Sequence, residues 1–302
     1  MPTLHLLNTG KMPVPHLHLL NTGKMPVPHL HLLNTGKMPV PHPREPLVNL
    51  ALLINFTKQE LVDRYSGSIL GAAWTLILPL VNILIFIFVF SNLMGSRLPG
   101  SSSTYSYSIY LISGMIPWIA FSNTVTRSAF TFSGQSHIIR KIRISLPHLP
   151  LYIVLSESII FLISLIFFLL FLWATNNLPS ASIMILPFIF ITQQILAYAL
   201  GFLFAIFDVF IKDIREFVGV IFQLWFWLTP IVYVPDILPG HAQNWLSYNP
   251  AYIFIKAYHE LFAFGHPLDT QSLIILVLIA HLLLALAYLT FKKLEKDIRD
   301  FL

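Results

Sequence analysis

The chain has 302 residues, of which 56% are hydrophobic and only 10% are charged, and its mean hydropathy is +0.74. Because soluble domains carry roughly 25% charged residues, this composition excludes an ordinary soluble protein and predicts one membrane domain. The chain has no cysteine and a net charge of +5; this excludes disulfides and thiolate metal sites, and in a membrane protein the basic residues indicate orientation rather than nucleic-acid binding.

The first segment, residues 1–45, consists mainly of three near-identical copies of a 13-residue unit beginning at His5, His18 and His31. Each copy contains Asn-Thr-Gly and Pro-Val-Pro, which oppose a long helix, so we expect a disordered tandem repeat. The regular histidines allow metal binding as an alternative. Near-identity between copies favours an extension without function, or a start codon placed too far upstream, and we assign no metal ligand.

Residues 48–66 have the pattern of an amphipathic helix that lies along the membrane surface. Apolar side chains such as Leu53 occupy one side, and polar side chains such as Lys58 occupy the other. Glu60 and Arg64 fall toward the apolar side, where their i,i+4 spacing allows them to pair. The segment is too polar to cross a membrane.

Six apolar segments follow, and most reach the roughly 20 residues that a transmembrane helix needs. Sixteen of the 18 Lys and Arg residues fall on the side of the N-terminus, and Arg97 and Lys256 fall on the other. Since basic residues are retained in the cytoplasm, we expect an all-α integral membrane protein with six transmembrane helices, an N-terminal interface helix and both termini cytoplasmic. The six segments are 70–92, 109–126, 149–173, 183–207, 217–234 and 271–291.

Three stretches of this domain carry recognisable motifs. They run from Lys58 to Trp74, with Arg64-Tyr65-Ser66-Gly67-Ser68 in the middle, then from Gly114 to Ser128, and then from Lys212 to Pro250. In these stretches the chain resembles the ABC-2 type permeases that export polysaccharides such as O-antigen, capsule and teichoic acid. The motifs stand in the family's order, and the resemblance covers residues 46–302.

The resemblance implies a homodimeric permease that pairs with a separate ATP-binding ABC subunit and moves a lipid-linked glycan across the bacterial inner membrane. Membrane lipids would surround it, and no nucleic acid is expected. Gly10-Lys11 and its repeats lack the glycine spacing and the Ser or Thr of a phosphate-binding loop. We therefore expect a transport subunit without catalytic residues or cofactors of its own, with ATP and magnesium bound by the partner.

The resemblance also places a coupling helix between the second and third spans, at about residues 134–146. Isoleucines there offer apolar contacts and basic residues offer charge to a cytosolic partner. An ordinary basic cytoplasmic loop explains the charges equally well. The candidate ATPase-coupling residues are His137, Ile138, Arg140, Lys141, Ile142 and Arg143.

Glu157 is the one carboxylate well inside a predicted span, where an ion is costly unless a partner or water is near. A role at the cytoplasmic entrance, paired with Arg127 or Arg140, competes with a structural contact between helices. The candidate residues of the interface helix and entrance are Lys58, Glu60, Arg64, Tyr65, Trp74 and Glu157.

Aromatic side chains gather near the outer ends of the second and fifth spans. Sugar rings can slide over such flat, amphipathic faces, although an interfacial aromatic belt is the alternative. Residues 235–270 predict an interfacial helix, which the resemblance refines to a segment that re-enters the outer leaflet. The candidate channel aromatics are Tyr107, Tyr110, Trp118, Trp225, Trp227 and Tyr233.

The sequence allows three alternative functions to be weighed against polysaccharide export. An ABC-2 permease for drugs or lipids would share the spans and the basic loop. A membrane-embedded lipid-linked glycosyltransferase would need clustered carboxylates for a metal and a sugar nucleotide, whereas Asp236, Glu260 and Asp269 are scattered. A proton-coupled flippase would need more intramembrane charge than Glu157 and His281 provide.

Overall fold

The computed structural model describes residues 50–98, 103–141 and 145–302. The chain divides into two units, Met1–Pro43 and Arg44–Leu302. The first unit, which contains the predicted repeat, lies outside the described residues, and so do the predicted coupling residues Ile142 and Arg143.

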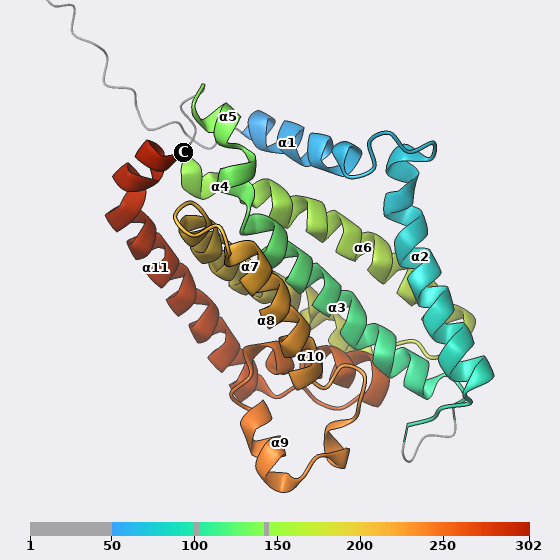
Figure 1. The fold of residues 1–302 in the computed structure, drawn as a ribbon. Coiled ribbons are helices and arrows are strands. Elements are labelled where there is room, and N and C mark those ends of the chain that lie inside the picture. Colours follow the sequence, from blue (N-terminus) through green and yellow to red (C-terminus); the bar gives the residue numbers. More distant parts are fainter. Residues whose placement is uncertain (1–49, 99–102, 142–144) are drawn as a thin grey trace, which may run out of the picture. The chain divides into compact units, whose positions relative to one another are not determined.

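The described part of the second unit is made of helices and contains no strand. In lipid a helix satisfies its backbone polar groups within its own segment, which suits long apolar stretches. The longer helices run side by side, with α1 lying across one end of them (Figure 1). The elements are α1 (Leu50–Asp63), η1 (Gly71–Ala73), α2 (Trp74–Ile87), the π-helix η2 (Phe88–Leu93), α3 (Ser106–Ser128), α4 (Thr131–Gly134), α5 (Ser136–Ile139), η3 (Leu146–His148), α6 (Leu151–Ala174), η4 (Ala181–Ile185), α7 (Leu186–Asp208), α8 (Ile214–Leu228), η5 (Pro235–Ile237), α9 (Gly240–Leu246), α10 (Pro250–His259), the π-helix η6 (Glu260–Phe264) and α11 (Thr270–Phe301).

Five helical segments in the described ranges are long and apolar enough to cross a membrane. They coincide with the first four predicted spans and the last one. The segments are Gly71–Ser91, Ser106–Ser128, Leu146–Ala174, Ala181–Asp208 and Thr270–Phe301.

The predicted fifth span, residues 217–234, corresponds to α8, which is shorter and begins earlier. α8 has 15 residues, or about 22 Å at 1.5 Å per residue, against a hydrocarbon thickness of about 30 Å. It ends at Leu228, and Thr229 has extended backbone angles. Pro230 explains this end, because the residue before a proline is displaced from the helical region.

α3 is the helix around which the others pack. In the most apolar stretch of α3, 72% of the residues are buried, which is the highest share among the five candidate spans. α3 packs against α2, α6, α7, α8 and α10. A Cβ atom at Gly201 of α7 would lie only 2.5 Å from the Cβ of Ser128. Glycine therefore permits the close approach of α3 and α7, while α11 packs along α7.

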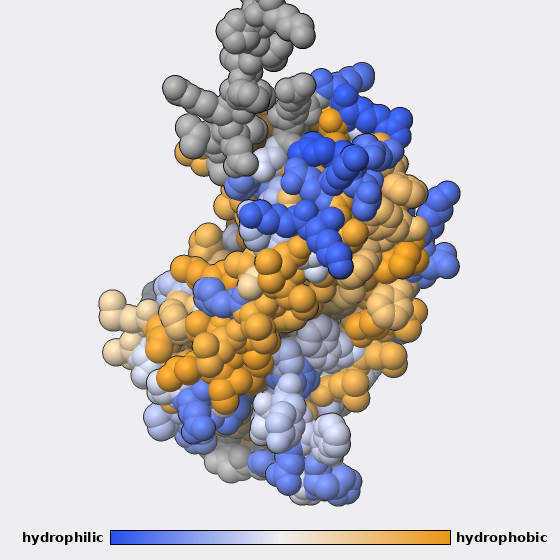
Figure 2. Space-filling model, turned by 90° about the vertical axis from the view of Figure 1, so that its left-hand side faces the viewer, coloured by the Kyte–Doolittle hydropathy of each residue, from blue (hydrophilic) through white to orange (hydrophobic). Residues whose placement is uncertain are grey.

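The sides of the bundle are apolar. Figure 2 shows a broad hydrophobic band across one face, with hydrophilic side chains gathered at its two ends. The exposed side chains on four helices include Leu84, Leu170, Leu224 and Leu282. Continuous exposed apolar surface of this extent marks contact with a membrane or a partner, and together with five apolar helices it identifies a multi-pass membrane protein.

Candidate functional site

Four charged side chains meet where α1, α3 and α6 come together. Glu60 lies on α1, Arg64 follows its last residue, Arg127 is near the end of α3, and Glu157 is on the second turn of α6. Only 1% of the Glu157 side chain is exposed. We call these four residues the ion-pair cluster.

Glu157 is the centre of the ion-pair cluster. The Arg64 guanidinium contacts its Oε1, and Arg127 Nη1 donates to the same oxygen at 3.0 Å. Asn123 Nδ2 donates to Oε2 at 3.4 Å. Arg127 in turn contacts Glu60, so ionic contacts join α1, α3 and α6.

The pairing differs from the i,i+4 contact expected between Glu60 and Arg64. Each of the two contacts another helix instead, because a buried carboxylate such as Glu157 requires cationic partners, whereas an exposed i,i+4 pair stabilises by only about 0.3–0.5 kcal/mol. Of the two partners considered for Glu157, Arg127 contacts it. Arg140 instead donates to the Leu302 carbonyl.

A cavity of about 190 Å³ lies beside the ion-pair cluster, between α2, α3 and α6. Arg64, Tyr65 and Glu157 of the predicted entrance residues line it. Thr75, another lining residue, has a buried hydroxyl without a hydrogen-bond partner among the described residues. The cavity thus joins polar groups to an apolar wall between three helices.

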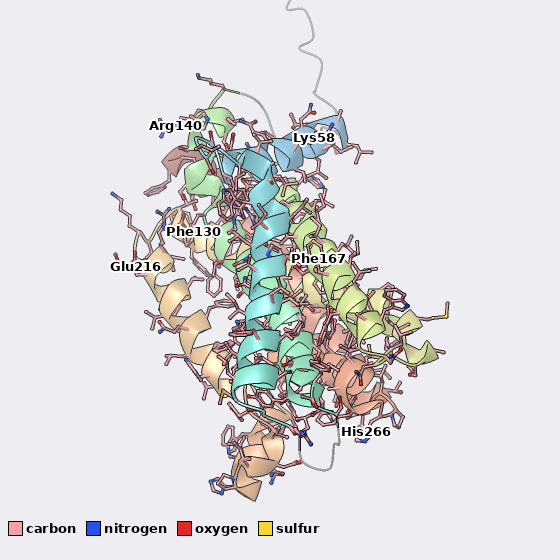
Figure 3. The ribbon with its side chains drawn as sticks, turned by 90° about the vertical axis from the view of Figure 1, so that its right-hand side faces the viewer. Lys58, Phe130, Arg140, Phe167, Glu216 and His266 are labelled. Atoms are coloured by element: carbon pink, nitrogen blue, oxygen red, sulfur yellow. The ribbon has the colours of Figure 1, made fainter. Side chains whose placement is uncertain are left out.

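The remaining predicted entrance residues do not line this cavity. Glu60 reaches the ion-pair cluster through Arg127. Trp74 Nε1 donates to Ser68 Oγ at 2.8 Å, which holds the turn before α2. Lys58 is exposed on α1, at the end of the bundle where Figure 3 also shows Arg140.

The predicted coupling segment begins with α4 and α5, at this same end. His137, Arg140 and Lys141 are exposed, and Ile138 is half-buried. Ile139 is buried in a hydrophobic cluster that includes residues of α6, α7 and α11. The segment therefore presents basic side chains outward from an apolar attachment.

Polar contacts also hold this segment to the turn between α7 and α8. Ser133 Oγ donates to the Asp208 carboxylate at the end of α7, and the Arg215 guanidinium lies 4.6 Å from the centre of the Phe130 ring. No local sequence pattern predicts these contacts, because the residues that make them lie far apart in the chain.

Most of the candidate channel aromatics surround the far end of α8. Trp118 and Trp225 stack edge to face, with ring centres 6.3 Å apart. Tyr110 is buried and donates to the Tyr233 carbonyl at 2.8 Å, while Tyr107 donates to the carbonyl of the preceding residue, Val232. The tyrosines thus hold the segment after α8, whereas Trp227 is 60% exposed.

An aromatic groove of about 660 Å³ lies between the end of α8 and α9. Trp225 and Tyr233 line it, together with Trp245 and Tyr248, which are not among the predicted channel aromatics. Asn249 fixes one wall, because its side chain accepts from Trp225 Nε1 at 2.8 Å and donates to Thr229 Oγ1 at 3.0 Å. The groove offers flat, amphipathic faces suited to sugar rings.

Comparison with known proteins identifies what the chain is similar to. Residues 52–263 match the family described as "ABC-2 type transporter". The chain is 30% identical over 252 residues to an "O-antigen export system permease protein RfbA" of Klebsiella pneumoniae, covering 83% of this chain and 95% of that protein. A Myxococcus xanthus protein of the same name is 26% identical, covering 82% of this chain and 94% of the relative. The "Polysialic acid transport protein KpsM" of Escherichia coli is 19% identical, with coverages of 71% and 82%.

Proposed function

The chain belongs to the ABC-2 type transporter family, and from this premise we propose that it is the permease subunit of an exporter of lipid-linked polysaccharide in a bacterial inner membrane. The observation that carries the proposal is the match to O-antigen permeases along 95% of their length. The aromatic groove supports it, because sugar rings pack on such faces.

We propose that α8 supplies a sixth crossing, extended by the hydrogen-bonded segment after Leu228. The five longer spans alone would leave the two ends of the chain on opposite sides of the membrane. Figure 1 shows α1, α5 and the C-terminus at the same end of the bundle. Basic residues gather there, among them Lys58, Arg140 and Lys292, and by the positive-inside rule this end is cytoplasmic, with α1 at the interface.

We propose a homodimer whose two copies meet through α2 and α8. Of the five candidate spans, the one containing α2 has the smallest buried share, 11%. α8 exposes Gln223 and Gly219 together with apolar residues, and a polar glutamine is better placed against another helix than in lipid. α2 and α8 flank α3 (Figure 1), so a second copy would enclose a route between them.

Energy would enter through an ATP-binding ABC subunit that carries ATP and magnesium and docks on α4, α5 and the basic residues after them. The exposed Arg140 and Lys141 provide charge for this contact. The contacts of Ser133 and Arg215 with the α7–α8 turn would pass its movement to α8.

Deletion of the gene in its host, followed by complementation, tests the function. We expect polysaccharide to accumulate inside the deletion strain and to return to the cell surface with the wild-type gene. Surface polymer that is unchanged by the deletion would contradict export of polysaccharide and favour a drug or lipid permease.

The coupling assignment has its own test. We expect the double charge reversal R140E/K141E to lower ATPase stimulation by the permease several-fold in the purified complex, because two attractive contacts become repulsive. The matched control K292E/K293E reverses two exposed charges on α11. Equal stimulation by both variants would refute the assignment.

A further inference from the structure

A smaller cavity, separate from the aromatic groove, lies at the opposite end of the bundle from the coupling segment. Its volume is about 230 Å³, and α3, α10, η6 and the segment after Val234 surround it. Figure 3 places His266, one of its lining residues, at the end opposite Lys58 and Arg140. The charged lining residues are Asp236, Lys256 and Glu260, and the hydroxyl-bearing ones are Tyr252 and Tyr110, whose hydroxyl is bonded to the Tyr233 carbonyl.

These lining groups retain hydrogen-bonding capacity. Lys256 Nζ lies 3.7 Å from Glu260 Oε1 and 3.7 Å from Asp269 Oδ2, beyond the roughly 2.7–3.2 Å of a hydrogen bond. The Tyr252 hydroxyl makes no hydrogen bond within the described ranges. The cavity therefore offers both donors and acceptors to a ligand.

His259 is a buried polar residue beside the same cavity, and its Nε2 lies against Gly114 of α3, where a Cβ would come within 2.6 Å of it. Its side chain is stacked on Tyr110 with ring centres 3.8 Å apart, the residue is 3% exposed, and Nε2 has no hydrogen-bond partner in the part of the chain that the structure describes. Burial lowers the pKa of His259 to about 3, so its ring is neutral at physiological pH. The π-helix that follows at Glu260 is a rare element found frequently at functional sites.

The chemistry of the lining selects the class of ligand. An acyl chain does not suit this lining, because it would replace the water around Asp236, Lys256 and Glu260 and leave only their ion pairs as polar contacts. The described residues contain no group of three His, Asp or Glu arranged to hold a metal ion. The volume is below the roughly 300–1,000 Å³ of sites for drug-sized ligands.

A single sugar ring meets these constraints. Its hydroxyls both donate and accept, as the carboxylates, Lys256 and Tyr252 require. Its apolar face can pack on the flat pair formed by Phe264 and His266, whose ring centres are 5.6 Å apart at an interplanar angle of 15°.

We propose that this cavity binds one sugar unit of the exported polymer near the exit of the route. This rests on the proposed function, which supplies the polymer and the outward direction. The site differs from the aromatic groove in its chemistry, because carboxylates and an ammonium distinguish the arrangement of hydroxyls, whereas flat rings accept sugars with little discrimination. The cavity thus gives the exporter a place to favour its own polymer.

Saturation-transfer NMR tests the site, using the complex of this chain with its ATP-binding subunit in nanodiscs. The probe is the repeat-unit oligosaccharide released by mild acid from the host's surface polymer. We expect Y252F and E260Q each to bind it about tenfold more weakly, since Y252F loses a hydrogen bond to a sugar hydroxyl and E260Q replaces a charge-assisted hydrogen bond by a weaker neutral one. Y288F and E295Q are matched controls, because Tyr288 is exposed on α11, the Glu295 side chain is 44% exposed, and neither residue lines the cavity or the aromatic groove.

Weaker binding of the oligosaccharide by the two cavity variants, with unchanged binding by the two controls, would support the proposal. Equal signals in all four variants, or no signal from the wild-type complex, would overturn the sugar site. In that case polymer export by the complemented strain would still stand as evidence for the proposed function. Size-exclusion profiles check that each variant is folded, and Y252F keeps the aromatic ring in place.

Discussion

Replacing Glu157 by glutamine tests whether the ion-pair cluster stabilises the fold. E157Q keeps the shape of the side chain but leaves the Arg64 and Arg127 guanidiniums without their buried counter-ion. Removing one partner of a buried ion pair costs about 3–5 kcal/mol. Arg127 keeps its contact with Glu60, and its side chain is 30% exposed. We therefore expect a loss near the lower limit, about 3 kcal/mol.

The assay is equilibrium unfolding in mixed detergent micelles, followed by tryptophan fluorescence. E295Q is the matched control, because Glu295 pairs with Arg299 in an exposed i,i+4 contact expected to contribute about 0.3–0.5 kcal/mol. A double-mutant cycle of R64Q with E157Q should give a coupling energy of at least about 1 kcal/mol. Equal losses for E157Q and E295Q, or no coupling, would refute the reasoning.

Three further changes test other contacts. G201A should lower the free energy of unfolding by about 1–3 kcal/mol, because the added Cβ would meet the Cβ of Ser128 at 2.5 Å. N249A should cost about 1–2 kcal/mol, because Asn249 caps α10 and bridges two groups of the groove. For His259, folding lowers the pKa from 6.5 to about 3, so its contribution is complete above pH 6.5 and declines as the pH falls toward 3. At pH 5 the loss is about 2 kcal/mol, and H259N should remove this part of the pH dependence.

Thermal unfolding of the purified variants provides the measurement for all three. G219A is the control for G201A, since a Cβ at Gly219 would meet no atom within 4 Å, and N244A is the control for N249A, since Asn244 is exposed on α9. A G201A protein as stable as G219A would contradict the close approach of α3 and α7. Parallel pH profiles for wild type and H259N would show that burial of the ring has little energetic effect.

The sequence predicts most of the fold because hydropathy is a local property. Five of the six predicted spans match helices that are long and apolar enough to cross a membrane. The exception is the fifth predicted span, residues 217–234, which corresponds to the shorter helix α8. The apolar run continues through Pro230 to Val234, so hydropathy extends the span, while the backbone restriction imposed by the proline ends α8 at Leu228.

The candidate site was less accessible to prediction because its contacts join distant residues. Arg64 and Glu157 are separated by 93 positions, and the local i,i+4 pattern pointed to Glu60 instead. The cost of burying a carboxylate did indicate that Glu157 needs a cation. It did not distinguish among the arginines, because that choice depends on how α1 lies against α3 and α6.

The end of α3 connects the ion-pair cluster directly to the proposed coupling segment. Arg127 lies at the end of α3, and Phe130 and Ser133 follow within two turns. Arg127 binds α1 and α6 through Glu60 and Glu157, whereas Ser133 binds the end of α7. A displacement of α4 and α5 would therefore act on α1, α3, α6 and α7 through ion pairs and a hydrogen bond. We therefore expect the helices joined by these contacts to move together, as in a rigid-body movement of the bundle.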